Sequence, residues 1–272
     1  MRKHRARLQL LACRPYVASD CAPRRIAYLN VMDVASIKGS ANSCHACAIR
    51  NRAICADLDG EEIKALNSIG RRRKLRAGEQ LLWEGDEALL VANVVEGVLK
   101  LSSQTADGNT QILGLAYPSD FIGRPFGEIT PYGAKALTDA LVCVFHRKDF
   151  DGFAREHPRL EHKLLERTLT ELDRTRRWML LLGRMSAKEK IAAFLLELAE
   201  RLVPHDCSPV ALRETTHLVL PLSRQQIADV LGLTIETVSR QLTGLKKAGL
   251  IEITARRGVE ILDLDRLRSL SG

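Results

Sequence analysis

The fold is decided by residues 222–249, which read LSRQQIADVLGLTIETVSRQLTGLKKAG. This stretch carries the start and stop signals of two helices joined by a tight turn. Ser223 is a helix cap, and a glutamine three residues later is its capping-box partner. Gly232 permits a left-handed turn, Thr234 caps the second helix, and Gly249 ends it. The pattern predicts a helix-turn-helix.

The two predicted helices divide their residues between a core and a polar face. Six apolar residues supply the core between them: Ile227, Ala228, Leu231, Leu233, Val238 and Leu242. Four polar residues near the start of the second helix lie opposite that core, free to face a DNA major groove: Glu236, Thr237, Ser239 and Arg240. Arg240 suits guanine O6 and N7, Glu236 suits cytosine N4, and Ser239 suits a neighbouring base or thymine methyl. Phosphate contacts are expected from Ser223, Arg224, Lys246 and Lys247.

A wing follows this motif. Residues 250–254 and 258–262 are two short apolar runs joined by Ala255-Arg256-Arg257, which predicts a two-stranded hairpin with a basic tip. The alternative is an ordinary helical hairpin with solvated charges. The helix caps, the turn glycine, the polar face and the wing together favour a DNA reader.

Short apolar runs separated by glycines fill the region between residues 75 and 145: 80–83, 91–95, 98–101, 111–115 and 140–145. Asp107-Gly108 is a hairpin signal between two of them. Many short strands at close spacing predict a small antiparallel roll or barrel as the first domain.

A long helical period begins after His157-Pro158. Leu165, Leu169, Leu172 and Met179 fall on the a and d positions of a heptad seam, and Arg176 interrupts it. The apolar face of an amphipathic helix of about 25 residues is too long for one small roll to cover. We therefore expect this helix to pair with the same helix of a second copy in a dimer. Packing against its own chain is the alternative. Residues 187–202 predict a further helix, and 204–216 a polar loop.

The cysteines suggest a metal site. Cys44, Cys47 and Cys55 form a C-x2-C-x7-C pattern, and Cys143, in an apolar strand, is the candidate fourth ligand. The spacing is compatible with three alternatives: an iron-sulfur cluster, a zinc site completed by His45 or another cysteine, or no metal at all. Three further cysteines lack partners at ligand spacing and are expected to be free thiols: Cys13, Cys21 and Cys207.

Composition sets limits on the partners. The 272-residue chain has a net charge of +8 and 46% hydrophobic residues. Residues 1–31 hold seven Lys or Arg and one acid, so they carry +6 of this charge. Because little net charge remains in the rest of the chain, the prediction of DNA binding rests on the motifs and not on the overall charge. This tail is either a basic arm, a solvated tail, or a segment upstream of a true start at Met32. No membrane-spanning run or secretory signal is evident, which predicts a cytoplasmic protein.

The order of these parts resembles the cyclic AMP receptor protein superfamily, and within it the fumarate and nitrate reduction regulator (FNR) family. The resemblance covers about residues 44–265. Two motifs make it specific: the cysteine trio with a later single cysteine, and Glu236-Thr237-Val238-Ser239-Arg240, similar to the E-x-x-S-R of that family's recognition helix.

The resemblance implies a 4Fe-4S cluster held by Cys44, Cys47, Cys55 and Cys143. It implies that Glu236, Ser239 and Arg240 read a palindrome similar to TTGAT, four bases, ATCAA, as a homodimer. RNA polymerase is an expected further partner. The gap of seven residues before Cys55 is longer than in some members, which a loop tolerates. Residues 126–134 lack the arginine that pairs with a cyclic phosphate, so no cyclic nucleotide is expected.

The sequence therefore predicts an α+β chain: a basic tail (1–43), a sensor domain with cysteine loop and cyclic-nucleotide-binding-like antiparallel β-roll (44–157), a dimerisation helix (158–184) and a winged helix-turn-helix (185–272). We expect an oxygen-responsive transcription regulator of anaerobic or microaerobic metabolism, in which oxygen destroys the cluster and releases the dimer. The alternative is the same reader with a zinc-bound or metal-free sensor answering another signal. An enzyme is not expected, since no phosphate loop, nucleotide fingerprint or Ser/His/Asp constellation is present.

Overall fold

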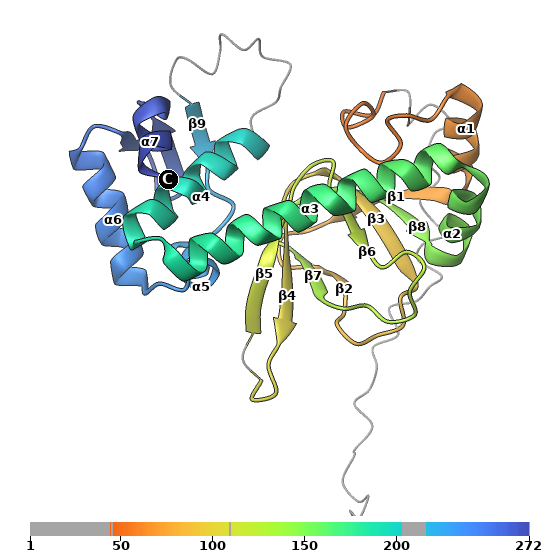
Figure 1. Cartoon of the computed structure of the whole chain (residues 1–272), viewed down its shortest axis with the longest axis horizontal. Coiled ribbons are helices and arrows are strands. Elements are labelled where there is room, and N and C mark those ends of the chain that lie inside the picture. The colour runs from red at the N-terminus through yellow and green to blue at the C-terminus, as the bar shows by residue number, and fades with distance from the viewer. Residues whose placement is uncertain (1–43, 45, 109, 203–215, 272) are drawn as a thin grey trace, which may run out of the picture. The chain divides into compact units, whose positions relative to one another are not determined.

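Two four-stranded antiparallel sheets form the expected β-roll (Figure 1). The computed structural model describes residues 44, 46–108, 110–202 and 216–271. The strand order of the first sheet is β1 (Gly70–Leu75), β8 (Ala140–His146), β3 (Leu90–Glu96) and β6 (Phe121–Gly123). That of the second is β2 (Gln80–Leu82), β7 (Gly133–Ala136), β4 (Leu99–Gln104) and β5 (Thr110–Ala116). The predicted hairpin joins β4 to β5.

Strand β8 shows how the roll sorts its side chains between two faces. Val142 and Val144 point into the core between the sheets. Leu141, Cys143 and Phe145 alternate with them and therefore lie on the outer face of the first sheet. The strand that holds Cys143 thus contributes to two cores at once.

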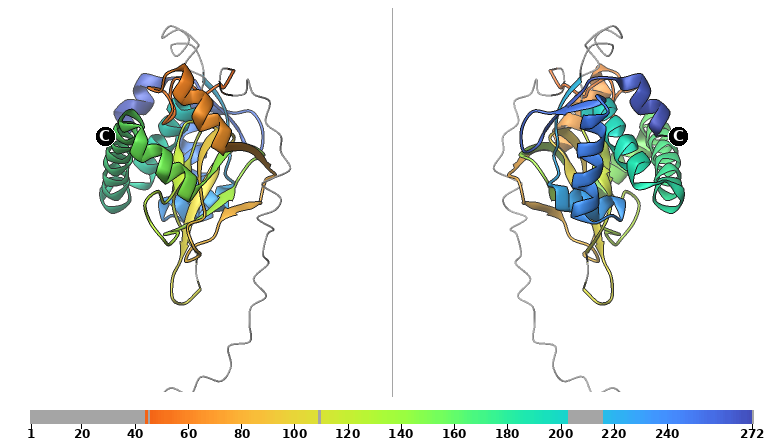
Figure 2. Two further views of the ribbon diagram at one scale, coloured as in Figure 1. Left: turned by 90° about the vertical axis from the view of Figure 1, so that its right-hand side faces the viewer. Right: turned by 90° about the vertical axis from the view of Figure 1, so that its left-hand side faces the viewer.

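Helices cover that outer face. α1 (Gly60–Ile69) and α2 (Arg147–Glu156) pack there, beside the segment that ends at Asp59. The left view of Figure 2 shows α1 in orange. α1 begins at Asp59 with a full capping box. These helices and β1 are not evident from the sequence pattern, because α1 and α2 are short and β1 reads Gly-Arg-Arg-Arg-Lys-Leu.

The next two helices have the bounds that the sequence pattern indicates. α3 (Pro158–Arg184) is 27 residues long and starts with proline in its first turn, where the missing N–H is not needed. α4 (Ala187–Leu202) follows. Among the described residues no helix is both long and apolar enough to cross a membrane.

The helix-turn-helix consists of α5 (Arg224–Leu231) and α6 (Ile235–Lys247). The caps are those expected: Ser223 makes the reciprocal capping box, Gly232 has φ +62°, and Thr234 accepts from the Thr237 N–H. The six predicted core residues pack together, with Leu233 only partly buried. The buried Lys190 of α4 donates to the Leu231 carbonyl at the end of α5, at 3.3 Å.

The wing has three strands rather than two. β10 (Ile251–Ile253) and β11 (Gly258–Ile261) form the expected hairpin, and β9 (Thr216–Val219) pairs with the free edge of β11. Thr216 therefore begins a strand, where the sequence suggested the end of a loop. Burial alternates along β9, which suits a strand with one face on the core. The short helix α7 (Leu264–Leu270) completes the described chain.

Gly97 should be the most substitution-sensitive of the turn glycines. It has φ +81°, and an added Cβ would lie 2.4 Å from the Asp139 carbonyl oxygen. Gly78 also has a positive φ, of +90°, but its added Cβ would meet nothing within 4 Å. We expect Gly97→Ala to lower the free energy of unfolding by roughly 2–4 kcal/mol, since overpacking adds to the cost of the left-handed backbone. Gly78→Ala should cost about 1 kcal/mol. Urea titration measures both, and equal losses would contradict the close approach at Gly97.

Candidate functional site

The exposed face of α6 carries the residues expected to read DNA. Glu236 and Arg240 are exposed, and Thr237 and Ser239 are half-buried. Val238, one of the core residues, is buried on the opposite side. Hydrogen bonds from the backbone N–H of Glu236 and from the Thr234 hydroxyl lower the pKa of Glu236, so its carboxylate is available as an acceptor.

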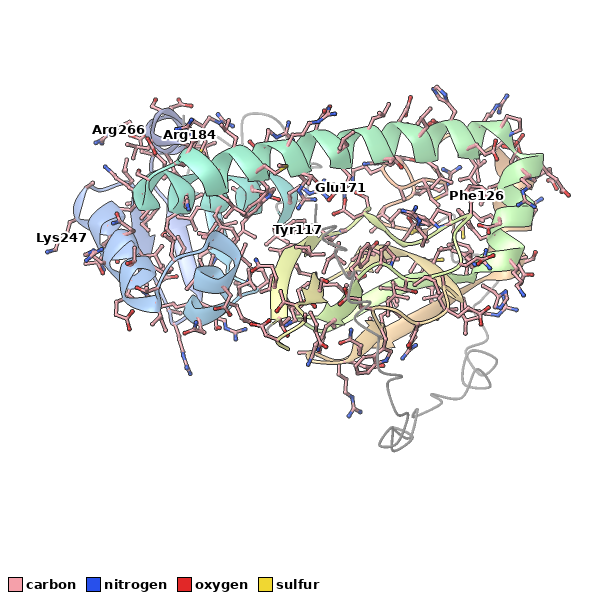
Figure 3. The ribbon with its side chains drawn as sticks, turned by 60° about the horizontal axis from the view of Figure 1, so that its bottom comes forward. Tyr117, Phe126, Glu171, Arg184, Lys247 and Arg266 are labelled. Carbon is pink, nitrogen blue, oxygen red and sulfur yellow. The ribbon has the colours of Figure 1, made fainter. Side chains whose placement is uncertain are left out.

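The side chains predicted to contact phosphates differ in their exposure and in whether they already have a partner within the protein. The Ser223 hydroxyl already accepts the Gln226 N–H, and Lys246 is paired with Glu252 at 2.5 Å. Lys247 is exposed and extends outward from the last turn of α6 (Figure 3). Arg256 and Arg257, at the tip of the wing, are exposed as well, and Arg224 is half-buried.

The predicted dimer face of α3 is apolar and exposed. Leu165, Leu169 and Leu172 are exposed, and Met179 is 70% exposed. Arg176 lies among them, 3.2 Å from Asp173 in an exposed ion pair. Leu180 and Leu182, further along α3, are also exposed and were not predicted.

Other residues of α3 face their own chain. Leu160 and Leu164 are buried in the same apolar cluster as Phe145, and Leu181 is buried further along. Arg174, which the sequence did not single out, lies over the Tyr117 ring and pairs with Glu197 at 2.6 Å. Burial opposes its charge, but Glu197, Glu171 and Asp120 raise the pKa of Arg174. Figure 3 labels two residues of this region, Tyr117, which follows β5, and Glu171, which lies on α3.

The four candidate metal ligands gather on the outer face of the first sheet. Cys44, Cys55 and Cys143 pack against the cluster that contains Phe145, while Cys47, Cys55 and Cys143 pack against a smaller one that contains Ile49 and Val95. All four are half-buried. The Cys44 thiol donates to the Asn67 side-chain oxygen of α1 at 3.1 Å.

Burial keeps two of these thiols protonated. Loss of solvent is the main cause and the neighbouring Cys44, Cys47 and Cys55 the lesser one that together raise the pKa of Cys143 to about 12. Burial likewise raises the pKa of Cys55 to about 11, although Arg50 opposes the shift. Cys44 and Cys47 raise the pKa of both Cys55 and Cys143, as expected of groups that lie close together.

Arg50 shapes the loop that carries three of the cysteines. Its guanidinium donates to the backbone carbonyls of Cys55, Ala56 (3.0 Å) and Leu58 (2.6 Å). The three carbonyls follow one another closely, so a single side chain fixes the turn after Cys55. Only the folded loop reveals this role, because an arginine between two cysteines has no distinctive sequence pattern.

The chemistry of this site suits an iron-sulfur cluster in the number and type of its thiols. Asn93, beside Cys143, also has a buried side-chain oxygen without a hydrogen-bond partner among the described residues. The thiols are gathered but do not stand in a ligating arrangement: among the described residues, no group of three His, Cys, Asp or Glu side chains could hold a metal ion as it stands. His45, the alternative zinc ligand, lies outside the described residues, as do Cys13, Cys21, Cys207 and the basic tail.

Comparison with known proteins identifies both halves of the fold. Residues 72–157 match the cyclic nucleotide-binding domain family, and residues 189–270 match the Crp-like helix-turn-helix domain family. The chain is 44% identical to the transcriptional activator protein FnrL of Cereibacter sphaeroides, over 84% of this chain and 92% of that one. It is 41% identical to the nitrogen fixation regulation protein FixK of Bradyrhizobium diazoefficiens, over 88% and 98% of the two chains.

A solved structure agrees with these relatives. FixK2 from Bradyrhizobium japonicum is 31% identical, covers 75% of this chain and 98% of its own, and superposes with a TM-score of 0.67. The matches confirm the α+β architecture of roll, long helix and C-terminal helix-turn-helix, and they identify a DNA-binding transcription regulator rather than an enzyme. The chain belongs to the FNR group of the cyclic AMP receptor protein superfamily.

Proposed function

We propose that this protein is an oxygen-responsive activator whose dimer is stabilised by a 4Fe-4S cluster on Cys44, Cys47, Cys55 and Cys143. The observation that supports it most is the apolar cluster shared by the cysteine site and α3. Cys44, Cys55 and Cys143 pack against the same buried group as Leu160 and Leu164 of α3. Any rearrangement of the cysteine loop therefore acts on the first turns of the dimer helix.

When bound, the cluster would supply an oxygen-labile link between the loop and β8. The residues of this chain do the rest. Arg50 holds the loop folded, Asn67 holds Cys44 near α1, and the raised pKa of Cys143 and Cys55 means that their protons must leave before iron is ligated. The thiols of Cys55 and Cys143 are thus neutral without metal.

The dimer would form through the exposed apolar face of α3. Four leucine and methionine side chains on that face have no cover within the described part of the chain: Leu165, Leu169, Leu172 and Met179. An apolar stripe on a long helix is typical of an interface with a second copy. Two such copies present two recognition helices to the two halves of a palindrome similar to TTGAT, four bases, ATCAA. RNA polymerase is the further partner, and no cyclic nucleotide is needed.

The names of the relatives supply the physiological setting. FnrL is named a transcriptional activator, and FixK is named for the regulation of nitrogen fixation. We accordingly place the target genes in anaerobic or microaerobic metabolism. A zinc-bound or metal-free sensor is the competing account of the same architecture.

Cluster content tests the proposal. Anaerobically purified protein should contain roughly four iron and four sulfide per chain and bind the palindrome, and Cys143→Ser should remove both properties. The matched control is Cys207→Ser, a cysteine without partners at ligand spacing, which should change neither. Iron analysis, the visible spectrum and DNA binding before and after air provide the measurement. A colourless, zinc-containing or air-indifferent DNA binder would refute the oxygen sensor and leave the DNA reader intact.

Base reading can be separated from phosphate contact. Arg240→Ala should weaken binding to the palindrome by about 1–3 kcal/mol and relax preference at one base pair, since a bidentate contact is lost. Lys247→Ala should weaken binding to all sequences alike and lower the salt dependence by about one charge. Titration of labelled duplexes at several salt concentrations measures both. If Arg240→Ala lost affinity equally for matched and mutated sites, Arg240 would not be a base reader.

Arg176 should make the dimer seam marginal. Two copies would bring like charges together across the two-fold axis, and the Asp173 pair is exposed and contributes little. We expect Arg176→Leu to dimerise more strongly than the wild type in the absence of iron. Sedimentation of the two apoproteins compares them, and no gain in the variant would rule out a repulsive role for Arg176.

A further inference from the structure

Asn93 of β3 is a buried polar residue without a structural explanation. It is 2% exposed, and its Oδ1 has no hydrogen-bond partner in the part of the chain that the structure describes. Buried polar side-chain atoms are nearly always paired, because an unpaired one loses its hydration without compensation. A residue of this kind in an otherwise apolar strand suggests that a partner is supplied by something other than the protein.

The register of the sheet places Asn93 beside the cysteine site. Asn93 is directly opposite Cys143 in the β3–β8 pair. Opposite residues of an antiparallel pair project to the same face, with Cβ atoms about 5 Å apart. The neighbours agree: Ala92 and Val94 face the roll core, whereas Val91 and Val95 belong to the clusters that the cysteines pack against.

The chemistry of a carboxamide indicates what its partner is. Its oxygen and nitrogen are almost the same size, so a half-turn of the amide puts two N–H donors where the orphaned oxygen lies. A sulfur that ligates iron accepts hydrogen bonds, so a bound cluster would supply the partner that the buried amide lacks.

We propose, on the basis of the cluster proposed above, that Asn93 is a positioning residue that donates an N–H hydrogen bond to a sulfur at the Cys143 side of the cluster. Hydrogen bonds to its sulfurs help to set the reduction potential of an iron-sulfur cluster. By stabilising the more reduced form, Asn93 raises that potential and slows the attack of oxygen. Asn93 therefore sets the oxygen level to which the protein responds.

The test uses Asn93→Leu, which has a similar size but no donor, in the anaerobically purified full-length chain. The cluster should assemble with wild-type iron and sulfide content, its midpoint potential should shift to more negative values, and its visible absorbance should decay in air several-fold faster. The apoprotein of the same variant should melt at a higher temperature than the wild-type apoprotein, because the unpaired amide is gone. A substitution that speeds the decay of the cluster in air but raises the melting temperature of the apoprotein is not expected at a residue with a purely structural role.

Two further variants keep the result interpretable. Val95→Ala loosens the packing on the same face without removing a donor, so its potential should stay at the wild-type value. Asn93→Ser keeps a smaller donor and should fall between wild type and Asn93→Leu. An unchanged potential and decay rate in Asn93→Leu, or shifts equal to those of Val95→Ala, would overturn the role of Asn93 alone. Wild-type protein without iron would overturn the cluster and the role of Asn93 together.

Discussion

The packing of α3 on the outer face of the first sheet is the contact on which the rest of the structure depends. Leu160 and Leu164 are buried against Phe145 and Phe150, and the three cysteines Cys44, Cys55 and Cys143 border that group. Burial of two leucines contributes several kcal/mol, enough to fix the start of a 27-residue helix. The far end of the helix leads into the reader. A local change at the loop would therefore act on the first turns of α3, whose leucines share this apolar group with the cysteines.

The electrostatics of the cysteine site bear on the proposed switch. Burial raises the pKa values of Cys143 and Cys55, so these two thiols are neutral without metal and need no counter-charge. Ligation requires thiolates, and metal binding must displace their protons. Arg50 holds the turn of the loop through backbone carbonyls in the state described. Acid should favour the metal-free state, because the protons compete with iron.

The features predicted correctly from the sequence are those that neighbouring residues determine. Ser223, Gly232 and Thr234 have the predicted caps and turn because each is fixed by neighbours within four residues. β1 escaped prediction because its arginines resemble a loop, and it becomes a strand only by pairing along its length with β8. β9 depends in the same way on the edge of β11. Arg50 and Asn93 were missed for a related reason: their contacts appear only when the loop and the sheet are folded.

The coupling between the cysteine site and α3 can be measured directly by hydrogen exchange on the anaerobic protein before and after air is admitted. The account predicts that amides of the first turns of α3, around Leu160 and Leu164, lose protection at the rate at which the visible absorbance decays, together with those of the exposed dimer face around Leu169. Amides of α6 should stay protected, because the reader has its own core. Loss of the cluster with unchanged exchange throughout α3 would contradict the proposed link between loop and dimer.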